Sequence, residues 1–488
     1  MDTEAEKTTV ADKKAKDRAA DRQSMMLTES VGKLIMRMSL PTILSFLITS
    51  IYNLADTFFV SSLGTNATAA VSVNQSLDMI VMMGGTMLAI GAASYISRLL
   101  GAGEKEQAAK VLSTCAFSAL AFGSIILLLG KIFIVPLVDL LGATDTCRQY
   151  SVDYANYVLY AAPVMSLSFV LNQSLRSEGA PLYSMVGIGV GGVLNCILDP
   201  FFIFDKVEIF GLTLGGLGLE VAGASIATAL SKAISLVILL VPYVSRRSML
   251  NLSLRKVSYE KKIVTEVTKV GASSLFRNAL SIVAGVVLNN IAGGISDSLL
   301  AAIGVSTKIM MFPFGFVLGF GNGFQPVAGF SWGAKNFPRV RASVRFASRA
   351  AFFGMAALGG LIAVFSGPLI GLFTVEDAEM MRLGQLCIIL QCIALPIHGW
   401  VAIVNMLCGS IGYGFGVTFL AIARQGTCFL PIVFPMAALF KAEGVCSVQA
   451  AADVISLFLA LPVLHKVNRM IDAAEASHLK ELEELNHA

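Results

Sequence analysis

Charged residues are scarce in this chain of 488 residues, since Asp, Glu, Lys and Arg together make up 14% of it. A soluble protein usually carries about 25% charged residues. Hydrophobic residues reach 56% of the sequence, and the mean hydropathy is +0.75. These values exclude an ordinary soluble domain and predict an integral membrane protein.

Signals of several other protein classes are also missing. The eight cysteines stand singly without a CxxC pair, so neither a zinc site nor a disulfide framework is predicted. The N-terminal segment has no apolar stretch followed by small residues, so we expect no secretory signal there. The basic residues are scattered over short loops, which argues against a nucleic-acid partner. The expected surroundings are a lipid bilayer.

Twelve apolar segments, bounded by glycine, proline or charge, are each long enough to cross a bilayer, which takes about 20 residues. They span residues 34–60, 69–97, 111–138, 154–175, 182–204, 221–244, 272–295, 299–330, 346–373, 383–408, 417–440 and 445–467. We therefore predict an all-α integral membrane fold of twelve transmembrane helices. The length leaves no room for a soluble catalytic domain, so we expect no enzyme and no cofactor.

Lysine and arginine predict the orientation of these helices, because cytoplasmic loops carry an excess of both. With both termini in the cytoplasm, the basic segments 98–110, 245–270 and 335–349 lie inside, whereas the outer loop 61–68 has no charge. The asymmetry predicts this topology in a bacterial plasma membrane.

The chain divides into two halves of six spans that resemble each other. Sliding one half by about 232 residues places the glycine-containing end of the second span, at 100–105, over 332–336. Two such halves share one orientation and form pseudo-symmetric lobes with a cavity between them, which is a transporter architecture. The predicted parts are an N-terminal cytoplasmic tail, expected to be disordered, an N-lobe, an inter-lobe loop, a C-lobe and a C-terminal cytoplasmic tail. Their bounds are 1–32, 33–245, 246–270, 271–468 and 469–488.

Ionisable residues inside the spans are few, and each costs about 2.5–3.5 kcal/mol on insertion scales, so a functional role is the first hypothesis. Asp56 ends the first span, and Asn195 and Asp199 share one helix face just before Pro200. Carboxylates with amide and hydroxyl neighbours bind Na⁺ or exchange a proton. We interpret other charges near span ends as side chains that reach the interface or the rim. These are Asp78, Lys232, Arg277, Lys308, Arg424 and Asp453.

Two further patterns concern packing and substrate. The glycine-rich stretches 187–192 and 315–323 follow no strand, so we interpret them as close helix packing and not as nucleotide loops. Methionines in the second and eighth spans are either core residues or the adaptable lining of a substrate cavity. The predicted cavity lining comprises Gln75, Met79, Met82, Asn172, Met310, Met311 and His398.

Six motifs occur in the order found in one known family. They are SLPTI at 39–43, NLADTFFV at 53–60, RLLGAG at 98–103, LDPFFIF at 198–204, GFQPVAG at 323–329 and WGAK at 332–335. Together they resemble the multidrug and toxic compound extrusion (MATE) family over about residues 33–469. Within it, the chain resembles the DinF-type subgroup and its bacterial drug-efflux relatives.

The resemblance implies twelve helices in two lobes around a central cavity, and alternating access. It also implies export of cationic or amphipathic organic compounds in exchange for H⁺ or Na⁺, and we expect a monomer. In the DinF-type pattern the coupling-ion site matches Asp56, Asn195, Asp199 and Thr228, which would also bind Na⁺ if that is the ion. NorM-type members resemble each other in acidic residues of spans seven and ten, where this chain has Arg277 and His398, so a C-lobe cation site is not expected.

Two alternatives stay open at this point. A lipid-linked precursor flippase of the same superfamily typically has several basic residues in its cavity, whereas Arg277 is the one candidate here. A polytopic membrane enzyme such as a prenyl transferase requires clustered aspartates that bind Mg²⁺, and the sequence shows no such cluster.

Overall fold

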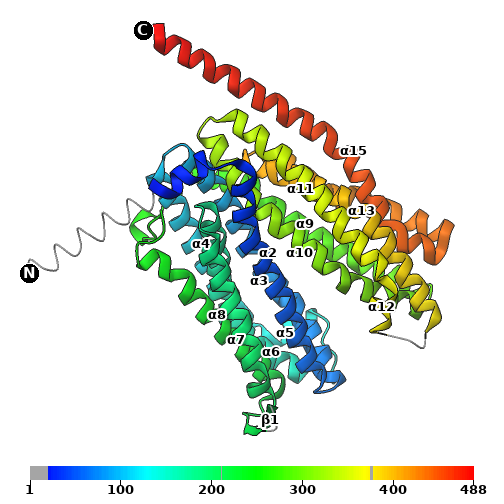
Figure 1. Ribbon diagram of the computed structural model, residues 1–488. Helices are drawn as coiled ribbons and strands as arrows, with labels where there is room; N and C mark the ends of the chain where they lie inside the picture. The colour runs from blue at the N-terminus through cyan, green and yellow to red at the C-terminus, as the bar shows by residue number, and fades with distance from the viewer. Residues whose placement is uncertain (1–19, 210–211, 374–376, 488) are drawn as a thin grey trace, which may run out of the picture. The chain divides into compact units, whose positions relative to one another are not determined.

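The computed structural model describes residues 20–209, 212–373 and 377–487 (Figure 1). The chain forms two compact units. Unit 1 comprises the described part of Met1–Ser24, together with Leu44–Ile96 and Glu104–Gly271. Unit 2 comprises Met25–Ile43, Ser97–Gly103 and Ala272–Ala488. The first long helix is therefore divided, because its start belongs to unit 2 and its remainder to unit 1.

Long α-helices make up nearly all of both units. Those of the first half are α2 (Val31–Ser61), α3 (Thr65–Gly101), α4 (Lys105–Ile132), α5 (Ile134–Leu140), α6 (Arg148–Ser177), α7 (Pro181–Ile203) and α8 (Glu220–Val244). Those of the second half are α9 (Lys261–Gly293), α10 (Asp297–Gly333), α11 (Phe337–Val364), α12 (Ser366–Gly371), α13 (Ala378–Ser410), α14 (Gly414–Ile422) and α15 (Leu430–His487). A π-helical turn, Ala423–Phe429, joins α14 to α15.

Eleven helical segments among the described residues are long and apolar enough to cross a membrane. The last of them, Gly414–Asn486, contains two of the predicted spans. Lys441 has a φ of 48° and a ψ of −125°, so it interrupts the helical geometry between these two spans. The prediction of twelve transmembrane spans is therefore confirmed.

The two halves repeat the same sequence of elements. Helices α3 and α10 each contain 37 residues, and α4 and α11 each contain 28. In both halves a one-residue break and a short helix, α5 or α12, follow the 28-residue helix. Both pairs of long helices begin 232 positions apart, so the repeat predicted from weak sequence similarity is confirmed.

One helix packs against several others in each unit. In unit 1, α6 packs against α4 and α8, and α7 packs against α8. In unit 2, α13 packs against α10, α11 and α15, and Figure 1 shows these helices running side by side. Small residues permit the close approach. A Cβ atom added to Gly123 of α4 would lie 2.5 Å from the Pro163 Cα of α6.

The structure differs from the expectation for the N-terminal tail. Residues 20–28 are helical, the Met26 side chain is fully buried, and Arg339 donates hydrogen bonds to the Met26 and Glu29 carbonyls. The prediction of a disordered tail over 1–32 is therefore wrong for its described part. At the other end, the tail 469–488 continues α15 as a helix through His487.

Two further differences concern the segments between spans. Helix α9 begins at Lys261, inside the predicted loop 246–270. A two-stranded antiparallel hairpin, β1 (Lys206–Ile209) and β2 (Leu212–Gly215), follows α7. Each strand is only four residues long, so alternating apolar residues there gave no distinct signal beside a helical span.

A buried carboxylate anchors the linker that follows α8. Glu178, at the end of α6, is fully buried and accepts hydrogen bonds from the Ser248 hydroxyl, at 2.8 and 2.7 Å, and from the Met249 amide. Burial raises the pKa of Glu178 from 4.5 to about 7, although the hydrogen bond from Ser248 opposes the shift. The carboxylate therefore connects the α6–α7 corner to the linker at a cost in desolvation.

This carboxylate predicts a pH dependence of stability. Because its pKa is raised in the folded protein, the stability linked to Glu178 is fully present below pH 4.5 and is lost as the pH rises through about 7. We expect Glu178→Gln to flatten the fall in melting temperature between pH 5 and pH 8. Thermal unfolding of both proteins in detergent at several pH values tests this, and parallel curves would contradict it.

The α4–α6 contact gives a second prediction. Gly123→Ala should destabilise the protein by about 1–3 kcal/mol, because the added methyl meets backbone atoms of Ala162 and Pro163 that have little room to move. Gly360→Ala on α11 is the matched control, since no heavy atom lies within 4 Å of its added Cβ. Melting curves should show a loss for Gly123→Ala alone, and equal melting temperatures would refute the packing argument.

Candidate functional site

The first component of the candidate site is a pair of polar residues on α7. Asn195 and Asp199 lie one helical turn apart, and the Asn195 amide donates a hydrogen bond of 2.8 Å to Asp199 Oδ1. Both side chains are buried, and Asp199 is 0% exposed. Pro200 has no amide hydrogen, so the Cys196 carbonyl one turn earlier loses its helical donor beside the pair.

A second pair of polar residues, Thr228 and Lys232, comes from α8, which packs against α7. Thr228 Oγ1 accepts a hydrogen bond of 3.3 Å from the Asn195 amide. The glycine-rich stretch of α7 allows this approach, because a Cβ on Gly191 would lie 2.9 Å from the Ser235 Cβ. The Ser235 hydroxyl donates to the Gly187 carbonyl at 2.6 Å. The interpretation of this stretch as helix packing is confirmed.

A third pair lies on α2, where Tyr52 precedes Asp56 by one turn. Gly192 of α7 leaves room for the Tyr52 ring, since an added Cβ would lie 2.8 Å from that ring. The Tyr52 hydroxyl accepts a hydrogen bond of 2.7 Å from Lys232, one turn after Thr228 on α8. Three helices of unit 1 therefore each contribute two polar residues four positions apart.

Several oxygen atoms in this cluster are buried without a donor. Asp56 Oδ1, Asn195 Oδ1 and Asp199 Oδ2 have no hydrogen-bond partner among the residues that the structure describes. A buried polar atom without a partner costs about 1–3 kcal/mol. Such atoms are therefore candidates for contact with a ligand. All three belong to residues predicted for the coupling-ion site, and all are acceptors.

Charges around the pairs extend the site beyond its predicted members. Lys232 interacts electrostatically with Asp56 and with Asp78 of α3, and Asp56 interacts with Asp78 and Asp199. The interpretation of Lys232 and Asp78 as interface or rim charges is therefore wrong. When all of these groups are ionised, three carboxylates and one ammonium leave an excess of negative charge, which attracts a cation.

The donor set limits how a cation can be bound. No three His, Cys, Asp or Glu side chains in the described ranges come close enough together to hold a metal ion. A bound Na⁺ would therefore depend on the Asn195 and Thr228 oxygens in addition to carboxylates. A proton needs one unpartnered carboxylate oxygen, which Asp56 and Asp199 each provide. The cluster suits either ion chemically.

The predicted substrate residues lie in different environments. On α3, Gln75, Met79 and Met82 are exposed and follow one helix face, with Met79 at 47% and Met82 at 37%. Asn172 is buried in unit 1, and its amide oxygen accepts a hydrogen bond from Ser184. Met311 is 46% exposed, whereas Met310 is fully buried.

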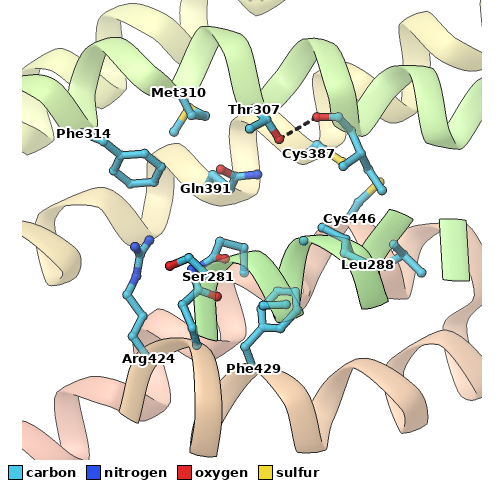
Figure 2. Close-up of a pocket in the computed structure, with 16 residues that line it drawn as sticks. Ser281, Leu288, Thr307, Met310, Phe314, Cys387, Gln391, Arg424, Phe429 and Cys446 are labelled. Atoms are coloured by element: carbon cyan, nitrogen blue, oxygen red, sulfur yellow. Dashed lines mark hydrogen bonds between the residues drawn. The ribbon is translucent and has the colours of Figure 1, made fainter. Parts of the chain in front are cut away.

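Unit 2 contains a partly open pocket of about 200 Å³, shown in Figure 2. Met310 and Phe314 of α10 line it on one side, and Phe429 lines it on another. Its polar lining is Ser281, Thr307, Gln391, Arg424, Gln425 and Gln449. None of the described lining residues is acidic, so the lining itself offers no carboxylate to a cation.

Arg424 is paired with Asp453, and the sequence analysis interpreted both as charges that reach the interface. It forms an ion pair with Asp453 at 2.6 Å, and its guanidinium lies 5.0 Å from the centre of the Phe314 ring. His398 Nδ1 lies 3.8 Å from the same carboxylate, and its ring contacts Phe314 edge to face. Arg424 and Asp453 form a largely buried polar cluster. The interpretation of these two residues as charges that reach the membrane interface is therefore wrong.

Repeated six-helix units of membrane-spanning length, with a buried cluster of acceptor oxygens, define an integral membrane transporter. The sequence matches the MatE family over residues 41–201 and 274–431. This match covers more than half of the chain. The protein belongs to the MatE family, and the resemblance to MATE proteins is confirmed.

Curated relatives of this chain are similar to it over most of their length. The chain is 27% identical over 461 residues to the multidrug export protein MepA of Staphylococcus haemolyticus, covering 94% of this chain and 98% of that protein. MepA of Staphylococcus aureus is 27% identical over 438 residues, with 89% and 94% covered.

Two solved structures share the fold at 24% identity, each with a TM-score of 0.85 and 93% of this chain covered. One is a MATE protein in complex with MaL6, of which 99% is covered. The other is an outward-facing multidrug resistance MATE transporter of the MOP superfamily, of which 98% is covered.

The position of Lys232 gives a testable prediction. Removing its charge with Lys232→Gln leaves Asp56 and Asp78 without a neighbouring cation, so the site should attract a cation more strongly. We expect half-maximal activation of transport at an H⁺ or Na⁺ concentration lower by about tenfold or more. Transport rates in proteoliposomes at graded ion concentrations measure this.

Lys131→Gln is the matched control. Lys131 also contacts a tyrosine ring, at 4.1 Å from Tyr160, and donates to Asn156 at 2.6 Å, but it lies on α4. Its replacement should leave the ion dependence unchanged. An unchanged ion dependence in Lys232→Gln would contradict the assignment of Lys232 to the site.

Proposed function

We propose that this protein is a secondary active multidrug exporter of a bacterial plasma membrane. It exports cationic or amphipathic organic compounds in exchange for entering H⁺ or Na⁺. The observation that carries the proposal is the set of unpartnered acceptor oxygens of Asp56, Asn195 and Asp199 on two helices of unit 1. Membership in the MatE family and the names of the curated relatives support the substrate class.

The cation binds where Asp56, Asn195, Asp199 and Thr228 present oxygen atoms. Binding neutralises charge and supplies the partner that these acceptors lack, which stabilises the packing of α2 against α7 and α8. Release restores the excess negative charge. The two occupancy states therefore favour different arrangements of α2, and a ligand shifts an equilibrium only through such differential binding.

Helix α2 is suited to transmit this change. Its residues up to Ile43 belong to unit 2, and those from Leu44 onward, including Asp56, belong to unit 1. Pro41 lies inside the helix just before this division. Proline removes one helical hydrogen bond, which makes bending there less costly. A change at Asp56 thus acts on a continuous helix whose first part belongs to unit 2 and whose second part belongs to unit 1.

Exposed residues of α3 suit an amphipathic substrate. The face of Gln75, Met79 and Met82 combines an amide with flexible, polarisable side chains. Thioethers accommodate apolar groups of varied shape, and Asp78 on the same helix adds a negative charge. This combination supports organic cations as substrates. All proposed coupling residues come from one chain, so one copy suffices for the cycle.

The flippase alternative is less well supported. A lipid pyrophosphate requires several basic side chains, whereas the cluster in unit 1 is mainly acidic and contains Lys232 as its basic member among the described residues. The Arg424 side chain in unit 2 is already paired with Asp453. The proposal includes no catalytic step.

The main test is replacement of the two carboxylates. Asp56→Asn and Asp199→Asn should each reduce resistance of a pump-deficient host to organic cations to the level of the empty vector, because neither variant can gain and lose a cation at that position. Drug susceptibility at matched membrane expression measures this. Asp145→Asn is the control, since its side chain is 90% exposed and pairs with Arg148 outside the cluster.

Proteoliposomes identify the ion. Export of a fluorescent organic cation should follow either an imposed pH gradient or an imposed Na⁺ gradient in the wild type, and neither in Asp199→Asn. Normal resistance in both aspartate variants, or transport driven equally well without either gradient, would overturn the coupling proposal. Gradient-dependent translocation of a lipid pyrophosphate instead of the dye would favour the flippase.

A further inference from the structure

A row of arginines marks the first turns of α11. Arg341, Arg345 and Arg349 are spaced four residues apart, so they lie along one side of the helix. Their successive Cα atoms are about 6 Å apart along the helix axis. Arg341 is neutralised by Asp472 at 2.7 Å and by Glu475 at 2.6 Å, both from the C-terminal part of α15. No such partner appears for Arg345 or Arg349 among the described residues, and both are exposed.

These two arginines border a hollow on the outside of unit 2. It measures about 570 Å³ and is lined by Ala342, Arg345, Phe346, Arg349, Ala350 and Phe353 of α11. Phe353 is 67% exposed one turn beyond Arg349. Phe346 packs over Gly32 of α2, where an added Cβ would lie 2.9 Å from its ring. Charge at one end and apolar surface at the other are therefore combined in one place.

Helix α4, which corresponds to α11 in the first half of the chain, does not carry this pair of arginines. The positions of unit 1 that correspond to Arg345 and Arg349, 232 residues earlier, are Ser113 and Phe117 on α4. The Ser113 hydroxyl accepts a hydrogen bond of 3.2 Å from the Ser253 amide in the linker, so this side chain already has a partner within the protein. The basic hollow is thus particular to unit 2, and neither a helix end in general nor the duplicated fold explains it.

We propose that this hollow binds the head group of an anionic phospholipid. The phosphodiester lies between the Arg345 and Arg349 guanidinium groups, which match phosphate oxygens in geometry and charge. The acyl chains continue along Phe353, toward the membrane interior. Helix α11 starts at the boundary that the distribution of lysine and arginine assigns to the cytoplasm, and basic residues at that boundary attract anionic lipids.

A lipid is a better match than another protein segment or a soluble anion. Phe353 lies within the transmembrane helix and is exposed, so its natural contact is hydrocarbon. Asp472, Glu475 and Glu481 of α15, which would compete for the arginines, already pair with Arg341 or Lys335. The lipid site belongs to unit 2, whereas the proposed coupling residues belong to unit 1, and its test does not depend on transport.

The experiment compares lipids on the full-length protein in detergent. Dioleoyl phosphatidylglycerol and dioleoyl phosphatidylcholine share their acyl chains, but the first has an anionic and the second a zwitterionic head group. Each is titrated while the melting temperature and the lipid-bound fraction by native mass spectrometry are recorded. We expect tighter binding of phosphatidylglycerol and a higher melting temperature. The double variant Arg345→Gln/Arg349→Gln should lose this preference, with affinity falling roughly fivefold for each arginine.

Control measurements distinguish specific lipid binding at the two arginines from a general effect of positive surface charge. Lys261→Gln/Lys262→Gln removes two exposed positive charges at the start of α9 and should keep the preference for phosphatidylglycerol. Inorganic phosphate alone should not raise the melting temperature. Equal binding of both lipids by the wild type, an unchanged preference in the arginine variant, or an equal loss in the lysine control would each overturn the proposal.

Discussion

The burial of Asp199 inside a membrane helix bundle is the constraint on which the rest of unit 1 depends. An isolated carboxylate in such a place is costly, and here one oxygen accepts from Asn195 while the other has no partner among the described residues. The helices must approach closely to gather further polar groups around it, which glycines 191 and 192 of α7 allow. The same approach brings Asp56, Thr228 and Lys232 into one cluster. A site that is incomplete without a cation is suited to bind and release one.

The two units use buried charge differently. In unit 1 the acidic groups outnumber the basic ones, and acceptor oxygens stay unpartnered. In unit 2 the Arg424 guanidinium is paired with Asp453, and its remaining surface faces a cavity lined by neutral amides and hydroxyls. A duplicated scaffold thus holds an acidic, ion-responsive cluster in one copy and a neutralised pair in the other. This asymmetry agrees with a coupling site confined to the first half.

Sequence reasoning predicted the twelve spans, the repeat and the grouping of Asn195, Asp199 and Thr228, because these follow from hydropathy, helical spacing and family motifs. It missed Lys232, Asp78, Arg424 and Asp453, since a charge near a span end has the same sequence signature whether it reaches water or a buried partner. The pairing of Arg424 with Asp453 joins positions 29 residues apart through a π-helical turn, Ala423–Phe429. Only tertiary contacts reveal that pairing, and the same holds for the ordered residue Met26.

Cation binding at the Asp56–Asp199 cluster is proposed to favour one arrangement of α2 and substrate binding the other, so that each ligand opposes the other. Thermodynamic linkage requires that each ligand lower the affinity of the protein for the other ligand by the same factor. The most direct test is the affinity of the purified protein for a fluorescent organic cation, measured at increasing H⁺ and, separately, Na⁺ concentration. The affinity should fall about tenfold or more with one of these ions in the wild type and stay constant in Asp199→Asn. An affinity that responds equally in both proteins would contradict the account.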